Sequence, residues 1–421
     1  RPVSATVAIP DPALFDAPPH KRRNALLIDA VEFVVPLRVV ALRGAAPAEW
    51  GADFRTALGR RGALAFEARP QFSTLWKELG DPAGKGSAGT ADAVSLGDEW
   101  LGPAIATGRL QPVPDAETAR WWVSRRGGRG WRGSRRGRRR APTRPLFLLQ
   151  RSLSPRWQAL LRRDPATGRP TPRGRVYGAP FRWGCTLLAA RPRSLAARPG
   201  ARPVADWGDL VQPALRGRVA FSESPREFLT AALGVARLPP SPTAAQLSGR
   251  GPRLALRDAV ARLRDAALLI SDRDAPRALA SGDALAAVGS SATLAPLAMR
   301  SSAVETVAPA SGTALWADVW AVPAFAGGGV GGAGPSPLLP AWLELPLAPA
   351  RADPALGLRG GGASPLLLPA KGRGWRPAAA GGEPSYLLRG ALPPPAILAA
   401  SEFLTPPDDD VAAAFRDALA G

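Results

Sequence analysis

The stretch GRVYGAPFRWGCTLLAA, residues 174–190, decides how the fold is interpreted. Its last part, Leu187–Ala190, is an apolar run that follows glycine and proline breaks, which predicts a buried strand beginning at Leu187. The triplet Phe181, Arg182 and Trp183 stands just before that run. Aromatic and charged side chains at the mouth of a buried strand indicate either a ligand cleft in an open α/β sheet or an aromatic corner of the core. These residues alone favour neither interpretation.

Strand-like and helix-like segments alternate on both sides of this stretch. For example, Trp50, Phe54 and Leu58 follow one another at the spacing of a single helix face, between two short apolar runs. Such alternation with short connections predicts an α/β fold with parallel sheets. The predicted strands are 38–42, 63–68, 91–96, 217–221, 284–288, 304–307 and 315–322, and the predicted helices are 50–58, 72–79, 101–107, 227–233, 254–267, 275–281, 338–345, 397–402 and 411–419.

The positive charge is concentrated in one segment. The chain has a net charge of +21, and residues 125–144 contain ten arginines and no acidic residue. Arg/Gly sequence cannot bury a core, so we expect 125–173 to be a disordered basic insertion. A nucleic-acid partner bound by this segment is the less favoured alternative, because a general excess of arginine, glycine and proline also follows from the base composition of a coding sequence.

Composition argues against an enzyme. The 421 residues are 46% hydrophobic, enough for two or three domains with a sizeable core, and no run of about 18 uncharged apolar residues predicts a membrane span. The single cysteine, Cys185, and the single histidine, His20, leave no disulfide and no Cys/His zinc site. The match to G-x-G-x-x-G at 327–332 is not followed by a helix start, so we expect no dinucleotide and no other cofactor.

Three segments together resemble the periplasmic spermidine/putrescine-binding proteins of ABC transporters, members of the bacterial extracellular solute-binding protein family. They are DAVSLGDEWLGPAIATGRLQP (92–112), residues 174–190 with VADWGDLVQPALRGRVAFSESPREFLTAAL (204–233), and GTALWADVWAVP (312–323) with Gly289 and Ser290. Further matches, GPSPLL (334–339), GASP (362–365) and LPPPAIL (392–398), resemble plastid-type relatives most.

The resemblance implies a two-lobed periplasmic-binding-protein fold of type II, in which parallel-sheet lobes are joined by hinge crossings. It places an N-terminal tail at 1–37, one lobe at 38–180 plus 317–362, and the other at 181–316 plus 363–421. The crossings fall near Phe181, Trp316 and Ala363. It also implies capture of a polyamine for an ABC permease, in an extracytoplasmic compartment or, for a photosynthetic eukaryote, a plastid.

The same resemblance supplies candidate ligand residues. Glu227 and Asp318 match carboxylates that hold ammonium groups, and Trp316 shares one strand face with Asp318 because residues two apart point the same way. Trp183, Trp100 and Glu99 are candidates for the opposing wall. Glu223 stands next to a position where the family has a carboxylate, and Ser290 stands where it has a tryptophan. Several of these residues have a structural alternative. Trp183 and Trp316 could lie in the core, Glu227 could cap a helix or pair with Arg226, and Asp98 with Glu99 could form a solvated helix N-terminus.

About half of the family's polyamine site is altered in this chain. Ser224 replaces a carboxylate, Ser290 replaces a tryptophan, and Arg43-Gly44 replaces an aromatic and hydroxyl pair. A non-transport descendant of this fold in plastids, with a different ligand or an anionic one held by Arg182 and Arg226, is therefore an alternative.

Overall fold

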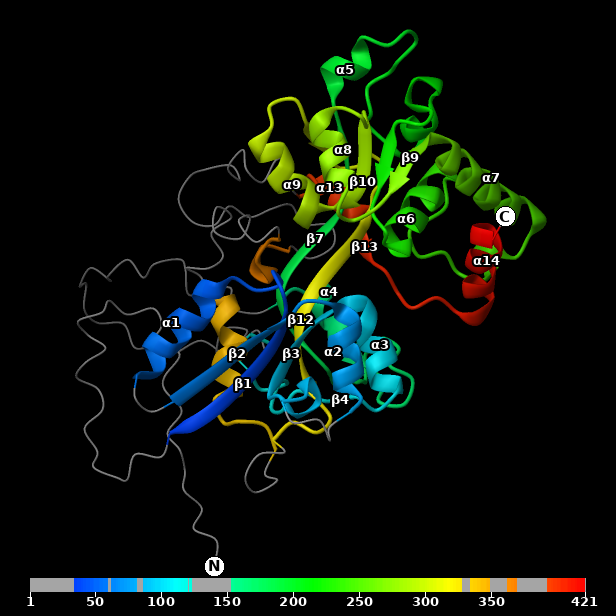
Figure 1. The fold of residues 1–421 in the computed structure, drawn as a ribbon. Coiled ribbons are helices and arrows are strands. Elements are labelled where there is room, and N and C mark those ends of the chain that lie inside the picture. The colour runs from blue at the N-terminus through cyan, green and yellow to red at the C-terminus, as the bar shows by residue number, and fades with distance from the viewer. Residues whose placement is uncertain are drawn as a thin grey trace, which may run out of the picture.

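Two long antiparallel strands, β7 (Ala179–Ala190) and β12 (Ala314–Pro323), form the centre of the structure and run through both halves of it (Figure 1). The computed structural model describes residues 34–59, 62–81, 86–119, 121–122, 153–327, 334–348, 362–368 and 392–420. Within them, an eleven-stranded sheet has the order β2-β1-β3-β12-β7-β10-β8-β9, with β4 and β13 beside β12 and β11 beside β7. Most side chains of the two central strands are buried, as expected for strands covered on both faces.

The predicted break before Leu187 is wrong, because β7 is continuous from Ala179. Arg182 is paired with Asp318 but Pro180 with Val319, so the register skips Phe181 and the strand carries a bulge there. Proline cannot donate to a sheet and is tolerated at such irregularities, which explains why the Gly-Ala-Pro sequence does not end the strand.

The first lobe is built on β1, β2 and β3, which are parallel to one another, as predicted. In α1 the predicted face is real, since Phe54 is completely buried and Leu58 nearly so. The strand β1 begins within the predicted N-terminal tail. The elements of this lobe are β1 (Val35–Leu42), α1 (Ala48–Leu58), β2 (Gly62–Arg69), α2 (Phe72–Leu79), β3 (Ala93–Gly97), α3 (Asp98–Ala106), β4 (Leu110–Gln111) and α10 (Leu339–Glu344).

The second lobe surrounds the other end of β7. Strand β8 is parallel to β9 and β10, and β10 and β11 are antiparallel to β7. The long helix α7 buries Leu256, Val260 and Leu263, the face predicted for it. The elements are α5 (Pro192–Ala196), β8 (Val219–Phe221), α6 (Pro225–Val235), α7 (Arg250–Ala266), β9 (Ala267–Ile270), α8 (Ala275–Ser281), β10 (Ala286–Ser290), α9 (Ser291–Arg300) and β11 (Glu305–Val307).

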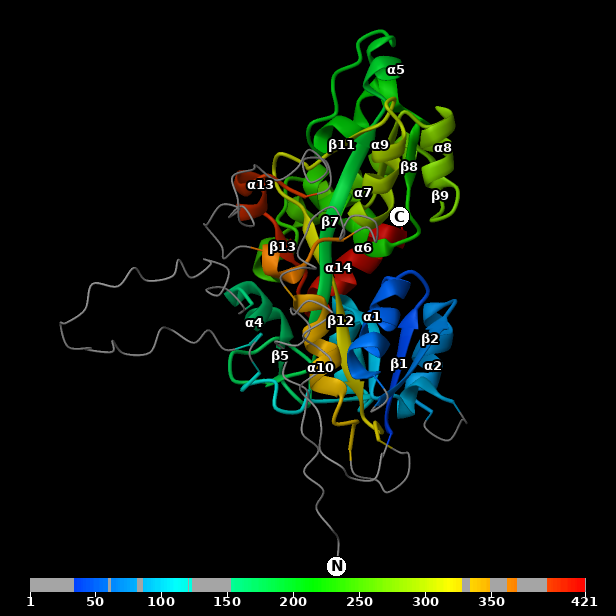
Figure 2. The same cartoon turned by 90° about the vertical axis from the view of Figure 1, so that its left-hand side faces the viewer.

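The C-terminal segment returns along both lobes. Its helix α13 (Pro395–Ala399) is followed by β13 (Glu402–Phe403), which pairs with β12, and by α14 (Asp409–Ala420), which packs on α7 in Figure 2. Short 3-10 turns at 88–90, 207–211, 213–215, 245–247, 345–347 and 365–367 complete the described elements.

Part of the expected disordered insertion is folded. Helix α4 (Pro155–Leu161) and the short pair β5 (Arg162–Arg163) and β6 (Arg175–Val176) lie within or next to 125–173. Trp157 is completely buried, and its indole N–H donates to the carbonyl of Pro365 at 3.0 Å. Leu153, Trp157 and Leu161 recur at helical spacing, a signal hidden by the neighbouring arginines. The Arg/Gly run itself, 125–144, lies outside the described residues.

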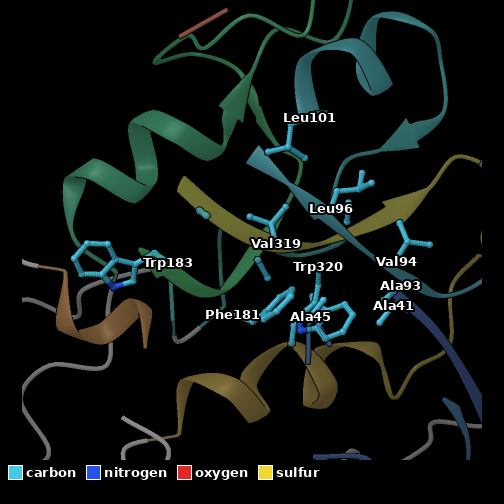
Figure 3. Packing of buried hydrophobic residues seen from close by; sticks show 14 of the residues in the cluster. Ala41, Ala45, Ala93, Val94, Leu96, Leu101, Phe181, Trp183, Val319 and Trp320 are labelled. Atoms are coloured by element: carbon cyan, nitrogen blue, oxygen red, sulfur yellow. The ribbon is translucent and has the colours of Figure 1, made fainter. Parts of the chain in front are cut away.

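A continuous hydrophobic core extends from the first lobe along the central strands to α8 and α9 of the second lobe, and it contains a group of aromatic rings. Phe181 stacks on Trp320 at a centroid distance of 4.5 Å, and Trp320 meets Trp342 edge-on at 5.3 Å. Figure 3 shows Phe181, Trp320 and Trp183 among these buried side chains. A separate core in the second lobe lies between α6, α7 and the sheet.

Candidate functional site

A cavity of about 210 Å³ lies where the central strands meet the beginnings of three helices. The cavity is lined by the residue that precedes each of these helices: Gly97 before α3, Ser224 before α6 and Ser290 before α9. Because α3 belongs to the first lobe and the other two to the second, this cavity lies between the lobes. Its lining residues are Gly97, Glu99, Arg182, Thr186, Ser224, Arg226, Glu227, Ser290, Ala292, Trp316, Ala317 and Asp318.

Strand β12 presents Trp316 and Asp318 to the cavity together, as the spacing of two residues predicts. The indole N–H of Trp316 donates to the carbonyl of Cys185 at 3.2 Å. Gly184 allows this close approach, since a Cβ there would lie 2.4 Å from the indole ring and 2.2 Å from the Ser291 hydroxyl. The ring is therefore held against β7 by a position that requires glycine.

Asp318 is already paired with a cation from the protein. The guanidinium of Arg182, directly opposite on β7, donates to the Asp318 carboxylate and lies over the Trp316 ring at 5.7 Å from its centroid. Its other end donates to the carbonyl of Gly44 at 3.3 Å. Both side chains are largely buried, with 18% of Arg182 and 20% of Asp318 exposed.

A second arginine joins the two lobes. Arg226, in the first turn of α6, donates to Asp98 at 3.1 and 3.2 Å and to Glu99 at 2.9 Å, both in the first turn of α3. Only 1% of the Asp98 side chain is exposed, and this carboxylate also accepts the backbone N–H of Ala317 at 2.9 Å. The arrangement is a buried ion pair with its hydrogen bonds satisfied, placed across the interlobe gap.

Glu227 is the acidic side chain of the site that differs from the others. Its side chain is buried, it accepts the hydroxyl hydrogen of Ser222, and no ion pair to it occurs among the described residues. Burial raises the pKa of Glu227 to about 6; the Ser222 hydrogen bond and Arg226 oppose this rise, and the charge of Asp272 adds to it. A buried carboxylate that lines a cavity and forms no ion pair is suited to hold a positively charged group.

Glu99 is more exposed than its neighbours. Desolvation in the cleft and the charge of Asp98 raise the pKa of the Glu99 carboxyl group, against the effect of Arg226. Because 46% of its side chain is exposed, water screens these effects. No group of three or more acidic, histidine or cysteine side chains within the described ranges is arranged to hold a metal ion.

Five of the eight predicted ligand residues line the cavity: Glu99, Glu227, Ser290, Trp316 and Asp318. The other three lie outside it. Trp183 is completely buried and its indole donates to the carbonyl of Ser364 at 3.0 Å, so the core alternative describes it. Trp100 packs on Phe72 at 4.3 Å, and the Glu223 side chain is exposed to solvent.

The partners of the carboxylates are not evident from the sequence. The sequence suggests Arg182 and Arg226 as groups for an anionic ligand, and Arg226 also as a partner of Glu227. In the structure Arg182 instead pairs with Asp318, and Arg226 with Asp98 and Glu99. Four further lining residues, Gly97, Thr186, Ala292 and Ala317, were not predicted. The neighbouring charges in SPRE were a signal for Arg226, but no sequence signal pairs Arg182 with Asp318, which lie 136 positions apart.

Comparison with known proteins gives a family match. Residues 62–330 match the sequence model of the family described as bacterial extracellular solute-binding protein. No curated protein matches the chain. Among the described residues, no helix is long and apolar enough to cross a membrane.

Solved structures share the two-lobed fold at low sequence identity. A spermidine/putrescine ABC transporter substrate-binding protein from Streptococcus pneumoniae, in complex with calcium and HEPES, has a TM-score of 0.60 and 13% identity, with 92% of this chain and 98% of that one covered. A putative spermidine/putrescine ABC transporter from Listeria monocytogenes has a TM-score of 0.56 and 14% identity, covering 91% and 98%. The TpPotD lipoprotein of Treponema pallidum has a TM-score of 0.55 and 13% identity, covering 91% and 97%. These comparisons give no support to the plastid-type resemblance.

Proposed function

The chain belongs to the bacterial extracellular solute-binding protein family, and from this premise we propose that it captures a small organic cation between its lobes. The family makes it a solute-binding protein of ABC transporters, with no enzymatic activity. Its partners are a small-molecule ligand and a permease, and its location is extracytoplasmic. Polyamines are the first cations to test, because they are named in the descriptions of structurally similar proteins.

The unpaired carboxylate of Glu227 carries this proposal. A buried charge without a partner is destabilising, and an ammonium group in the cavity would supply both the opposite charge and N–H donors. Each such charge-assisted bond contributes about 1.5–3 kcal/mol. The indole of Trp316, on the same cavity, offers an apolar surface to the alkyl part of an amine.

The size of the cavity favours a short amine. Its volume of about 210 Å³ lies below the roughly 300–1,000 Å³ of pockets that hold drug-sized ligands. Among the polyamines, we therefore expect the four-carbon diamine putrescine to fit better than the longer spermidine.

Closure of the lobes about β7 and β12 is part of the proposal. We retain the boundaries 38–180 plus 317–362 and 181–316 plus 363–421, with crossings near Phe181, Trp316 and Ala363. The backbone bonds between Trp183 and Ala363, at 3.0 and 2.8 Å, support a third crossing beside the two strands. A ligand shifts the lobes toward the closed state only through contacts that it makes with both of them.

Titration calorimetry at pH 7.5 tests the proposal with putrescine, spermidine and a set of small anions. We expect binding of amines, and a loss of about ten- to hundred-fold in affinity in Glu227→Gln. Glu223→Gln is the matched control, since it removes the same charge four positions away from an exposed side chain. A folded protein that binds no amine, or equal losses in the two variants, would refute the proposal.

A second candidate is a small anion, favoured by the presence of Arg182, Arg226 and three helix N-termini at the cavity. Its weakness is that both arginines already bind carboxylates of the protein. The same calorimetry distinguishes it, because an anion would keep its affinity in Glu227→Gln.

Nucleic-acid binding through residues 125–144 is a separate alternative. It predicts an affinity for nucleic acid that falls steeply with salt concentration and vanishes on deletion of that segment.

A further inference from the structure

The Asp318 and Trp316 side chains together form a site for a cation, and the protein fills it itself. Asp318, whose side chain is 20% exposed, supplies a carboxylate, and Trp316 supplies the face of an aromatic ring. Both groups attract a positive charge. The guanidinium of Arg182 satisfies both, since it donates to the carboxylate and lies over the ring. A ligand ammonium at this place would make the same two interactions.

From this arrangement we infer that Arg182 is a specificity-determining residue that limits the ligand to a single ammonium group. This inference rests on the proposed function, in which Glu227 holds that ammonium. Of the three acids that line the cavity, Asp318 is paired with Arg182 and Glu99 with Arg226, which leaves Glu227 for the ligand. The ligand class is therefore a small primary amine whose other end carries no second positive charge.

Arg182 is held in place by its own strand. It lies opposite Asp318 in the β7–β12 register, next to the bulge at Phe181, and also donates to the carbonyl of Gly44. A second ligand ammonium would have to displace this tethered guanidinium from Asp318 or remain beside it, and two like charges in a partly buried cavity repel each other. A neutral end group meets neither obstacle.

The inference is tested with butylamine and putrescine, which share a four-carbon chain and differ in the number of ammonium groups. We expect the wild-type protein to bind butylamine at least as tightly as putrescine. In Arg182→Gln the affinity for putrescine relative to butylamine should rise about ten- to hundred-fold, because Asp318 becomes available. Arg182→Met is a second neutral variant that keeps apolar contact with Trp316.

Three controls separate this role from a general effect of charge. Arg193→Gln removes one positive charge at an exposed position of α5 and should leave the affinity ratio unchanged. Arg182→Lys keeps the positive charge and should also leave it near the wild-type value. The double variant Arg182→Gln/Asp318→Asn should lose the gain, because the carboxylate that would hold the second ammonium is gone.

The outcomes are distinct. A wild-type protein that prefers putrescine, or a ratio that does not change in folded Arg182→Gln and Arg182→Met, would overturn the inference and leave the proposed function standing. An equal rise in Arg193→Gln would also overturn it, since the effect would then be one of net charge. Failure of every amine to bind to wild type and variants would overturn both.

Discussion

Removal of the guanidinium that joins the lobes, by Arg226→Gln, is expected to destabilise the protein strongly. Its partner Asp98 is only 1% exposed, so the variant leaves a buried carboxylate without its cation. Breaking a buried pair in this way costs about 3–5 kcal/mol. Since Asp98 keeps the N–H of Ala317 and Arg226 itself is 16% exposed, we expect the lower end, about 3 kcal/mol.

The measurement is urea unfolding followed by tryptophan fluorescence and by circular dichroism, with the two transitions compared. Arg262→Gln is the control, because Arg262 and Asp258 form an exposed pair at 3.6 Å on α7, where a loss below about 0.5 kcal/mol is expected. The double variant Arg226→Gln/Asp98→Asn should recover part of the loss, as expected for coupled partners. A loss below about 1 kcal/mol in Arg226→Gln, or no recovery in the double variant, would refute the buried-pair reasoning.

Three further predictions concern the cavity. The pKa of Glu227 is about 6 in the folded protein, against 4.5 for an ordinary carboxyl group, so its ionisation costs about 2 kcal/mol of stability above pH 6, and this cost disappears as the pH falls below 4.5. We therefore expect Glu227→Gln to unfold at a higher urea concentration than wild type at pH 7.5. A variant that is equally or less stable than wild type would contradict the raised pKa. Protonation of the same group should weaken amine binding as the pH falls through 6, measured by calorimetry, whereas a pH-independent affinity would exclude Glu227 as the anchor. Gly184→Ala should lower the free energy of unfolding by about 1–3 kcal/mol and change the tryptophan fluorescence, because its Cβ would overlap the Trp316 ring. Gly251→Ala is the control, since a Cβ there has no atom within 4 Å and should not destabilise the protein. Equal stability of the two variants would contradict the close packing of Trp316 on Gly184.

Helix and strand patterns in the sequence predicted much of the fold. The apolar faces of α1 and α7 were legible because Phe54, Leu58, Leu256 and Val260 recur at helical spacing. The continuity of β7 was not, because a bulge beside a paired strand can accommodate Pro180, and that strand is far away in the sequence. The helix α4 was missed because its apolar pattern adjoins an arginine-rich run.

The sequence by itself determined the α/β class, the family resemblance and the face of β12 that carries Trp316 and Asp318, since these depend on local periodicity and on ordered motifs. Only the tertiary structure decided which charges meet. Arg182 pairs with Asp318 across two strands, and Arg226 pairs with Asp98 across the lobes. Within the described part of the chain Glu227 has no such partner, and burial is the main cause of its raised pKa. Charge pairing and desolvation depend on distances between residues remote in the chain, so the character of the cavity is a property of the folded protein.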